Sequence, residues 1–219
     1  MKLNIEPVKQ RQKNFANIKL GEGSETIYDS GCLLVSLQML LNFLFEKNYS
    51  PPSLNTELKN KGCFKTNQSL LVLSKVANAY DLEYSKVLTG DLVSVVKASL
   101  DRGVPIILDV VLSGHQHFVL AVGYDVNLLV NDPWWGETHW HQINYSKIIS
   151  LRILRKKTDK PSETLCKCLD MVSKLNSENQ KITQENRELL NTLGRWQSKL
   201  STANDSLRVI SEELNKIIS

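Results

Sequence analysis

The spacing of apolar residues in the last quarter of the sequence limits most strongly what this chain can fold into. From Leu165 to Ile217, apolar residues and two asparagines recur at alternate intervals of three and four residues. With Leu165 at position a of a heptad, every later member falls at position a or d, which is the pattern of a coiled coil. The stripe is two positions in seven wide, too narrow for a helix that lies on a globular core. The series is Leu165, Cys168, Val172, Leu175, Asn179, Ile182, Asn186, Leu189, Leu193, Trp196, Leu200, Ala203, Leu207, Ile210, Leu214 and Ile217.

The seam residues predict how such chains associate. Asn179 and Asn186 occupy successive a positions, where a buried amide pairs with the same amide of a parallel, in-register partner. Leucine at a with isoleucine at d, as in Leu207 and Ile210, favours three or four strands, whereas an asparagine at a is common in dimers. We favour a parallel homotrimer, with a dimer and a tetramer left open. An intramolecular hairpin would need a break, and the heptad register continues through Gly194.

Charge separates this segment from the rest of the chain. Residues 158–219, called the stalk, hold nine Lys/Arg and nine Asp/Glu, so the net charge of +4 belongs to residues 1–157, called the head. A charge of +4 without a recognition motif gives no reason to expect a nucleic-acid partner. No run of eighteen apolar residues predicts a membrane span, and the first residues lack the apolar core of a signal peptide. We therefore expect a cytoplasmic or virion-associated protein.

The head shows helical spacing first and strand patterns later. This order predicts an α+β fold with N-terminal helices and an antiparallel sheet. The expected helices are 32–47, 53–61 with Ser53 as its cap, 68–80 and 92–101, and the expected strands are 104–112, 118–124, 127–131 and 148–154.

Three residues of the head form a candidate catalytic group. Cys32 opens the first long helix, where unpaired backbone N–H groups and the helix dipole favour a thiolate. His117 and Asp132 stand at the ends of two strands joined by a short turn. If Tyr124 lies opposite Asn127, Val119 lies opposite Asp132, and His117 lies diagonally beside that carboxylate. A thiol, an imidazole and a carboxylate in this order are typical of a nucleophile, its base and the group that orients the base.

Five segments together resemble a known family. They are Gln10–Gly21, Thr26–Cys32, Ser36–Leu40, His117–Tyr124 and Asn131–Trp134. In order and spacing these segments resemble the papain-like cysteine peptidases related to bacteriocin-processing (double-glycine leader) peptidases, over about residues 5–150. The resemblance implies a papain-like fold and a peptide or protein substrate. We expect no cofactor or metal.

The same resemblance assigns roles to individual residues. Cys32 would be the nucleophile, His117 the general base and Asp132 the orienting carboxylate. Gln10 would supply the side chain of the oxyanion hole, together with the Cys32 backbone N–H, although Gln12 competes for that place. The family usually has Gly-Pro-Thr/Ser after the cysteine, whereas Leu33-Leu34-Val35 follows here. This departure raises doubt about substrate and rate.

Other side chains have weaker claims to a role. His115 is a rival to His117 as the base, and the His139/His141 pair matches no zinc motif. Trp134 and Trp135 lie just after Asp132 and are candidates for substrate binding, or else they pack the edge of the domain. Cys63 is expected to be an ordinary buried or loop thiol. Cys166 and Cys168 are expected at the start of the stalk.

The sequence thus favours a cysteine peptidase or amidase on a self-associating stalk. The main alternative is a catalytically weak or inactive papain-like module that serves as a structural or binding part of a multimeric assembly, such as a phage virion or tail. A cell-wall hydrolase that cuts peptide cross-links would use the same three residues.

Overall fold

A computed structural model describes residues 1–141, 145–157 and 163–218. The chain divides into two compact units, Met1–Cys166 and Lys167–Ser219. The predicted boundary between head and stalk adjoins residues 158–162, which lie outside the described residues, so it stays a prediction. All helices and strands except α6 belong to the first unit.

A six-stranded antiparallel sheet forms the centre of the first unit, in the order β1-β6-β2-β3-β4-β5. Its strands are β1 (Leu82–Val87), β2 (Ile106–Leu112), β3 (His115–Tyr124), β4 (Leu128–Asp132), β5 (Glu137–Trp140) and β6 (Lys147–Lys156). The helices are η1 (Lys13–Phe15, a 3-10 turn), α1 (Ile27–Ser30), α2 (Cys32–Phe45), α3 (Pro51–Asn60), α4 (Leu73–Ala79) and α5 (Leu92–Leu100). The predicted α+β class with an antiparallel sheet is confirmed.

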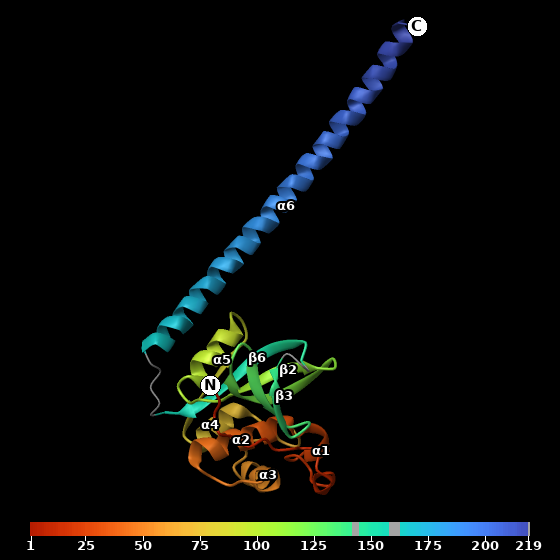
Figure 1. The fold of residues 1–219 in the computed structure, drawn as a ribbon. Helices are drawn as coiled ribbons and strands as arrows, with labels where there is room; N and C mark the ends of the chain where they lie inside the picture. Colours follow the sequence, from red (N-terminus) through yellow and green to blue (C-terminus); the bar gives the residue numbers. More distant parts are fainter. Residues whose placement is uncertain (142–144, 158–162, 219) are drawn as a thin grey trace. The chain divides into compact units, whose positions relative to one another are not determined.

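Alternation along the central strands divides the core between the two faces of the sheet. In β2, Ile107 packs with α2, α3 and α4 residues, whereas Ile106 and Leu108 pack with Val96 of α5. Figure 1 shows α5 on one side of the sheet and α2 and α3 on the other. Because both faces are covered, the central strands are apolar on both sides, which explains the unbroken apolar run in the sequence.

Helix bounds differ from the predicted ones at their ends. Ser50, not Ser53, caps α3, and the two serines form a reciprocal capping box. The third helix is shorter than predicted, because α4 covers only Leu73–Ala79. The residues before it form a loop in which Phe64 bridges to Leu71.

Two strands were not predicted, and one begins earlier than expected. β1 is an edge strand whose outward residues are polar or charged, so its periodicity is weak. β5 is the other edge and has only four residues. β3 begins at His115, because His115 and His117 pair with Leu112 and Val110 of β2.

The register between β3 and β4 is the predicted one close to the candidate site and different at the turn. The prediction implied Leu120 opposite Asn131, and these residues are paired. A bulge between Ala121 and Gly123 shifts the rest, so Tyr124 pairs with Leu128 rather than Asn127. The turn between the strands is therefore one residue longer than predicted. The extra residue at the bulge compensates for it, so the predicted pairing holds next to the candidate site.

The N-terminal segment joins the sheet at the same bulge. Lys2 bridges to Gly123, and the Leu3 N–H donates to the Val122 carbonyl at 2.7 Å. Farther along, the Gln10 N–H donates to the Pro133 carbonyl, also at 2.7 Å. These contacts carry Gln10 to the end of β4.

Helix α6 (Glu163–Ile218, 56 residues) makes up nearly all of the second unit. Seam side chains that the structure describes are exposed in this single chain, among them Leu189, Trp196 and Leu207. The side chains of Cys166 and Cys168 lie outside the described part. Among the described residues, no helix is long and apolar enough to cross a membrane.

Candidate active site

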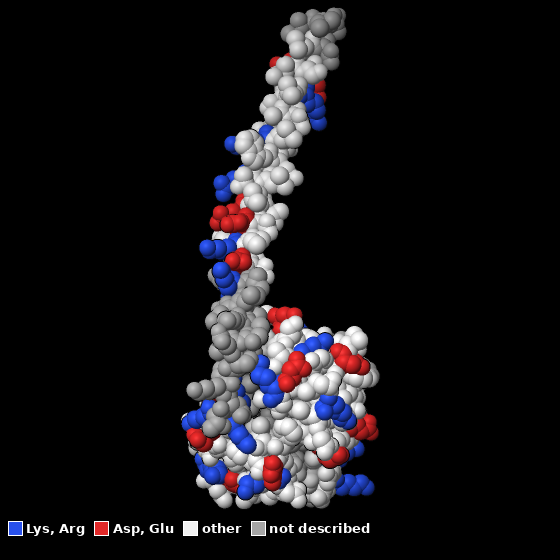
Figure 2. All heavy atoms as spheres, turned by 60° about the vertical axis from the view of Figure 1, so that its left-hand side comes forward, with Lys and Arg blue, Asp and Glu red and all other residues white. Residues whose placement is uncertain are grey.

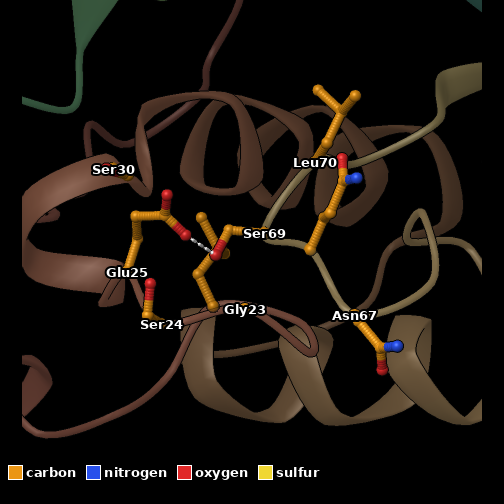
Figure 3. A pocket seen from close by; sticks show the side chains of 9 residues that line it. Gly23, Ser24, Glu25, Ser30, Asn67, Ser69 and Leu70 are labelled. Atoms are coloured by element: carbon orange, nitrogen blue, oxygen red, sulfur yellow. Dashed lines mark hydrogen bonds between the residues drawn. The ribbon is translucent and has the colours of Figure 1, made fainter.

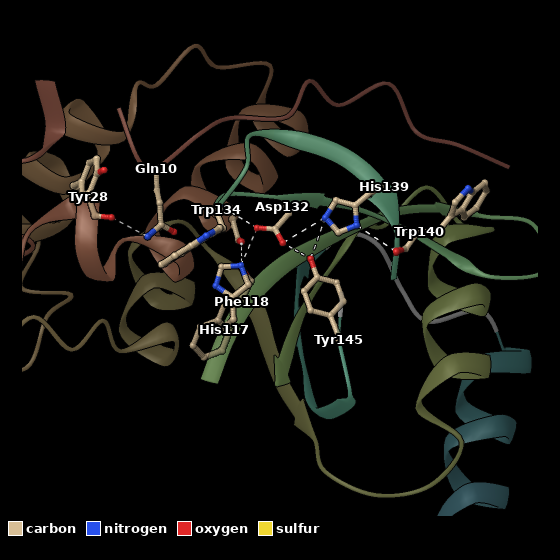
Figure 4. A network of polar contacts seen from close by, with 10 residues as sticks. Gln10, Tyr28, His117, Phe118, Asp132, Trp134, His139, Trp140 and Tyr145 are labelled. Atoms are coloured by element: carbon tan, nitrogen blue, oxygen red, sulfur yellow. Dashed lines mark hydrogen bonds and ion pairs between the residues drawn. The ribbon is translucent and has the colours of Figure 1, made fainter. Parts of the chain in front are cut away.

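Three neighbouring strands each bring one ionisable side chain to the same side of the sheet. Asp132 ends β4, and its diagonal neighbours are His117 on β3 and His139 on β5, as the pairing of Val130 with His139 and of Leu120 with Asn131 requires. Figure 4 shows the Asp132 carboxylate between the two imidazoles. The predicted proximity of His117 and Asp132 is therefore present.

His117 and Asp132 form a buried, directly bonded pair. His117 Nε2 lies 2.8 Å from Asp132 Oδ1, and the side chains are 5% and 0% exposed. Burial lowers the pKa of His117, but hydrogen bonds with Asp132 and Cys32, together with the charges of both groups, outweigh it and raise that pKa to about 9. The imidazole is thus held in its charged form near neutral pH.

Asp132 is held as a carboxylate by its neighbours. Burial alone would raise its pKa, but hydrogen bonds from His117 and His139, the charge of His117 and the hydroxyl of Tyr145 keep the pKa well below its usual range. The Trp134 backbone N–H also donates to Oδ1 at 2.6 Å. This carboxylate can therefore orient His117 without taking up a proton itself.

Cys32 lies at the first position of α2 and is half-buried. Its own N–H has no intrahelical acceptor, as at every helix start, so that donor points out of the helix. Cys32 is near enough to His117 for its thiol to help raise the pKa of that imidazole. Since Nε2 of His117 is bonded to Asp132, Nδ1 is the ring nitrogen that remains for the thiol. The Ser36 hydroxyl donates to the Phe118 carbonyl at 3.2 Å and ties α2 to β3 next to this contact.

The three residues after Cys32 do not disturb the start of the helix. Leu34 and Val35 are fully buried in the core that α2 shares with the sheet, and Leu33 is half-buried against the same core. The Val35 N–H donates to the Gly31 carbonyl at 2.9 Å, as in a regular first turn. The departure from the family's Gly-Pro-Thr/Ser is therefore used for packing behind the thiol.

Gln10 and Gln12 lie in different surroundings. Gln10 is fully buried, and its Nε2 donates to the Tyr28 carbonyl at 3.1 Å. Its Oε1 has no hydrogen-bond partner within the described part of the chain. Gln12 is exposed, and its amide donates to the Lys9 carbonyl. One N–H of the Gln10 amide remains for another acceptor, because an amide nitrogen carries two protons.

The two tryptophans have different neighbours. The Trp134 ring meets the edge of His117 at 6.2 Å between centroids, and the Arg11 guanidinium stacks on it at 4.3 Å. Arg11 also lies over the Tyr28 ring at 4.8 Å, so it links the two sides of the site. Trp135 instead packs against His139 at 5.6 Å. Trp134 thus borders His117, whereas Trp135 supports the second histidine.

The remaining candidates lie away from this group. His115 is exposed at the start of β3. Cys63 is fully buried, and burial raises the pKa of its thiol. In residues 1–141, 145–157 and 163–218, no cluster of His, Cys, Asp and Glu could hold a metal ion.

Sequence reasoning missed the contribution of two residues to this site. His139 was considered only as a zinc ligand, and Tyr145 was not considered. Tyr145 is buried; its hydroxyl donates to Asp132 Oδ2 and lies 3.2 Å from His139 Nε2. The available signal was the turn Pro133–Gly136: a hairpin there places His139 diagonally beside Asp132.

A separate cavity of about 460 Å³ lies on the helical side of the first unit. Figure 3 shows its lining, in which the Ser69 hydroxyl donates to the carboxylate of Glu25. Ser30, at the end of α1, borders it, but Cys32, His117 and Asp132 do not. This cavity is therefore separate from the candidate catalytic residues.

The arrangement has the parts needed for acyl transfer. A thiol lies near a charged imidazole, and a buried carboxylate is bonded to that imidazole. One N–H donor stands at the thiol's end of the helix and another on Gln10.

Comparison with known proteins identifies a family that matches the first unit. Residues 2–153 match the Peptidase C39-like family. Among solved structures, the chain is similar to the crystal structure of the peptidase domain of Streptococcus ComA, a bifunctional ABC transporter involved in a quorum-sensing pathway. The two are 15% identical, with a TM-score of 0.45, over 70% of this chain and 100% of that one. No curated protein matches.

Proposed function

Because the chain belongs to the Peptidase C39-like family, we propose that its first unit is a cysteine peptidase in which Cys32, His117 and Asp132 cleave a peptide bond. The observation that carries the proposal is the buried 2.8 Å pair of His117 and Asp132, together with a thiol at the start of a helix that helps to raise the pKa of His117. A charged imidazole beside a thiol favours the thiolate, which is the nucleophilic form.

The reaction follows from the positions of the protons. The Cys32 thiolate attacks the carbonyl carbon, and the carbonyl electrons move onto oxygen. When the C–N bond breaks, imidazolium His117 gives its Nδ1 proton to the leaving amine, and a thioester forms. His117, now neutral, takes a proton from water, whose oxygen attacks the thioester and releases the acid and the thiolate.

The developing negative charge on the carbonyl oxygen needs donors that are already in place. The Cys32 N–H at the start of α2 is one, and the second N–H of Gln10 Nε2 is the other. The Tyr28 carbonyl fixes the Gln10 amide by accepting the first N–H. Donors fixed in this way stabilise the transition state without a cost for reorganisation during the reaction.

Hydrolysis of fluorogenic peptides tests the proposal. We would use peptides with Gly-Gly before the scissile bond, a mixed-sequence library and a peptidoglycan stem peptide. Cys32→Ala should remove all hydrolysis, and His117→Ala should lower kcat/KM by at least ~10²-fold. Cys63→Ala is the matched control, because it removes a buried thiol distant from His117, and it should retain activity.

Full activity in Cys32→Ala would sink the peptidase proposal. No hydrolysis of any peptide by the wild-type chain, together with an unreactive Cys32, would favour the structural or binding module of a virion or tail. Hydrolysis of the stem peptide alone would instead favour the cell-wall hydrolase.

We also propose that α6 associates with copies of itself as a parallel coiled coil, with a trimer favoured. The large apolar seam side chains that the structure describes are more than half exposed in the single chain, including Leu189 at 66% and Leu200 at 65%. Figure 2 shows acidic and basic side chains interspersed along the described part of α6. A lone helix with an exposed apolar stripe gains little stability from packing. Association with helices of the same sequence would bury that stripe.

Sedimentation equilibrium of two variants tests this association. Leu207 at position a and Val209 at position c are both exposed in the single chain, at 63% and 53%. Leu207→Asp should lower the mass toward a monomer, whereas Val209→Asp should leave it unchanged, because only position a faces a partner. Equal effects of the two substitutions, or a monomeric wild type, would reject the coiled coil.

A further inference from the structure

The Asp132 carboxylate is shared between two histidines, and the proposed mechanism uses only one of them. Resting on that mechanism, we infer that His139 is a positioning residue, whose imidazolium holds Asp132 jointly with His117 and thereby sets the pH range in which the Cys32–His117 pair is active. His139 touches neither the thiol nor the N–H donors of the oxyanion site in the described contacts, so it acts through Asp132.

Both oxygens of the Asp132 carboxylate are surrounded by hydrogen-bond donors. Oδ1 accepts from His117 Nε2 at 2.8 Å and from the Trp134 N–H at 2.6 Å. Oδ2 accepts from the Tyr145 hydroxyl and lies 3.5 Å from His139 Nε2. A carboxylate has about four acceptor positions, and all four are directed at a neighbour here. A fully buried carboxylate stays charged only while its neighbours donate hydrogen bonds to it.

The protons in this network point to a charged His139. Tyr145 has a single hydroxyl proton, which it donates to Asp132, so its oxygen presents a lone pair to His139 Nε2 at 3.2 Å. His139 Nδ1 lies 3.2 Å from the Trp140 carbonyl, which can only accept. Both ring nitrogens of His139 therefore face acceptors, and only the imidazolium donates from both.

The groups around His139 support that charge. From β4, Asp132 raises the pKa of His139 by its hydrogen bond, burial lowers it, and Glu137 on β5 adds a smaller raising effect. His141 opposes these, but burial and the charge of His139 lower the pKa of His141, so it is the neutral member. The Trp135 ring also packs against the imidazole, nearly perpendicular to it.

Removing the charge of His139 should move the pH dependence of Cys32 reactivity in one direction, toward higher pH. With one cation fewer beside Asp132, the carboxylate attracts the His117 proton more strongly, and the pair binds its protons more tightly. The pH dependence of Cys32 reactivity should therefore move upward at both inflections, the one where the thiol loses its proton and the one where the imidazolium loses its proton. The expected shift is roughly half to one pH unit, since the charge lies within a few ångströms of the carboxylate.

The pH profile of Cys32 alkylation by iodoacetamide, resolved by peptide mass spectrometry in the full chain, tests this inference. His139→Gln keeps a donor and loses the charge, so both inflections of the profile should move to higher pH. His139→Lys keeps a charge at the same position and should return the profile toward wild type. His115→Gln is the control for loss of a histidine, because His115 is exposed on the same strand as His117.

Equal profiles for His139→Gln and wild type, or equal shifts in the Gln and Lys variants, would overturn the inference while leaving the peptidase proposal intact. A wild-type Cys32 whose reactivity ignores His117→Ala would instead overturn the peptidase proposal. Should the His139 variants not fold, ¹H–¹⁵N spectra of the histidine-labelled wild-type chain decide. Two protonated nitrogens on His139 at pH 7 support the inference, and one protonated nitrogen overturns it.

Discussion

At the scale of single residues, Gln10 and Gln12 have the same side chain but opposite surroundings. Gln10 is fully buried with its amide fixed by Tyr28, whereas Gln12 is exposed and bonded to Lys9. We expect Gln10→Ala to lower kcat by ~10²–10³-fold, as the loss of one oxyanion donor does, and Gln12→Ala to have little effect. Steady-state kinetics of both variants checks this, and equal losses would remove Gln10 from the oxyanion site.

The His117–Asp132 pair makes folding stability depend on pH. The pKa of His117 rises from 6.5 to about 9 on folding, so its contribution is fully present below pH 6.5 and is lost as pH rises through 9. Relative to His117→Gln, the wild-type free energy of unfolding should fall by up to roughly 3 kcal/mol between pH 6 and 10. Urea unfolding across this range measures it. Parallel pH curves for the two proteins would contradict the pairing.

The candidate residues differ in how far the sequence could predict them. Cys32 opens α2, Asp132 ends β4, and His117 lies near the start of β3. Their positions followed from periodicity and from one assumed register, which is correct next to the site but not at the turn. His139 and Tyr145 join Asp132 only through a four-residue strand and a loop, neither of which has a clear period. Short edge elements are defined by their pairing partners, which a local pattern does not contain.

At the scale of elements, the N-terminal segment positions Gln10 by pairing with the bulge in β3. A Cβ on Gly123 would meet the Met1 carbonyl oxygen at 2.6 Å and Lys2 Cα at 2.9 Å. Gly123→Val should therefore push this segment off the sheet, destabilise the fold by about 1–3 kcal/mol and lower kcat through misplaced Gln10. Thermal unfolding and kinetics measure both effects.

Val126→Ala supplies the control for Gly123→Val. Val126 lies in the same hairpin and is 84% exposed, so its truncation should change neither stability nor kcat. If Gly123→Val also proves neutral, the N-terminal segment does not hold Gln10 in place.

The elements also show where periodicity is a sufficient guide and where it is not. The central strands and α2 were predicted because they are buried on a whole face or on both faces. β1 and the bulge were not, since an edge strand needs no apolar period and an extra residue in a strand leaves no pattern of its own.

At the scale of the whole molecule, the chain combines a peptidase-like unit with a helix whose predicted seam contains two asparagines. Asn179 and Asn186 are exposed in the single chain, so their amides are available to a partner. Replacing both by Ile should stabilise the assembly toward heat and also broaden its distribution of oligomeric states, because buried amides select register and number at a cost in stability. Sedimentation velocity and thermal unfolding measure the two effects. A less stable or monomeric double variant would show that these asparagines do not face a seam.

The central claim is that Cys32 is a nucleophile activated by His117, and the alkylation rate of each cysteine against pH tests it most directly. The account predicts that Cys32 in the wild-type chain reacts with iodoacetamide below pH 7 faster than glutathione does, that Cys63 stays unreactive, and that His117→Ala abolishes the advantage of Cys32. A Cys32 that titrates like glutathione, with the same rates in wild type and His117→Ala, would contradict the account.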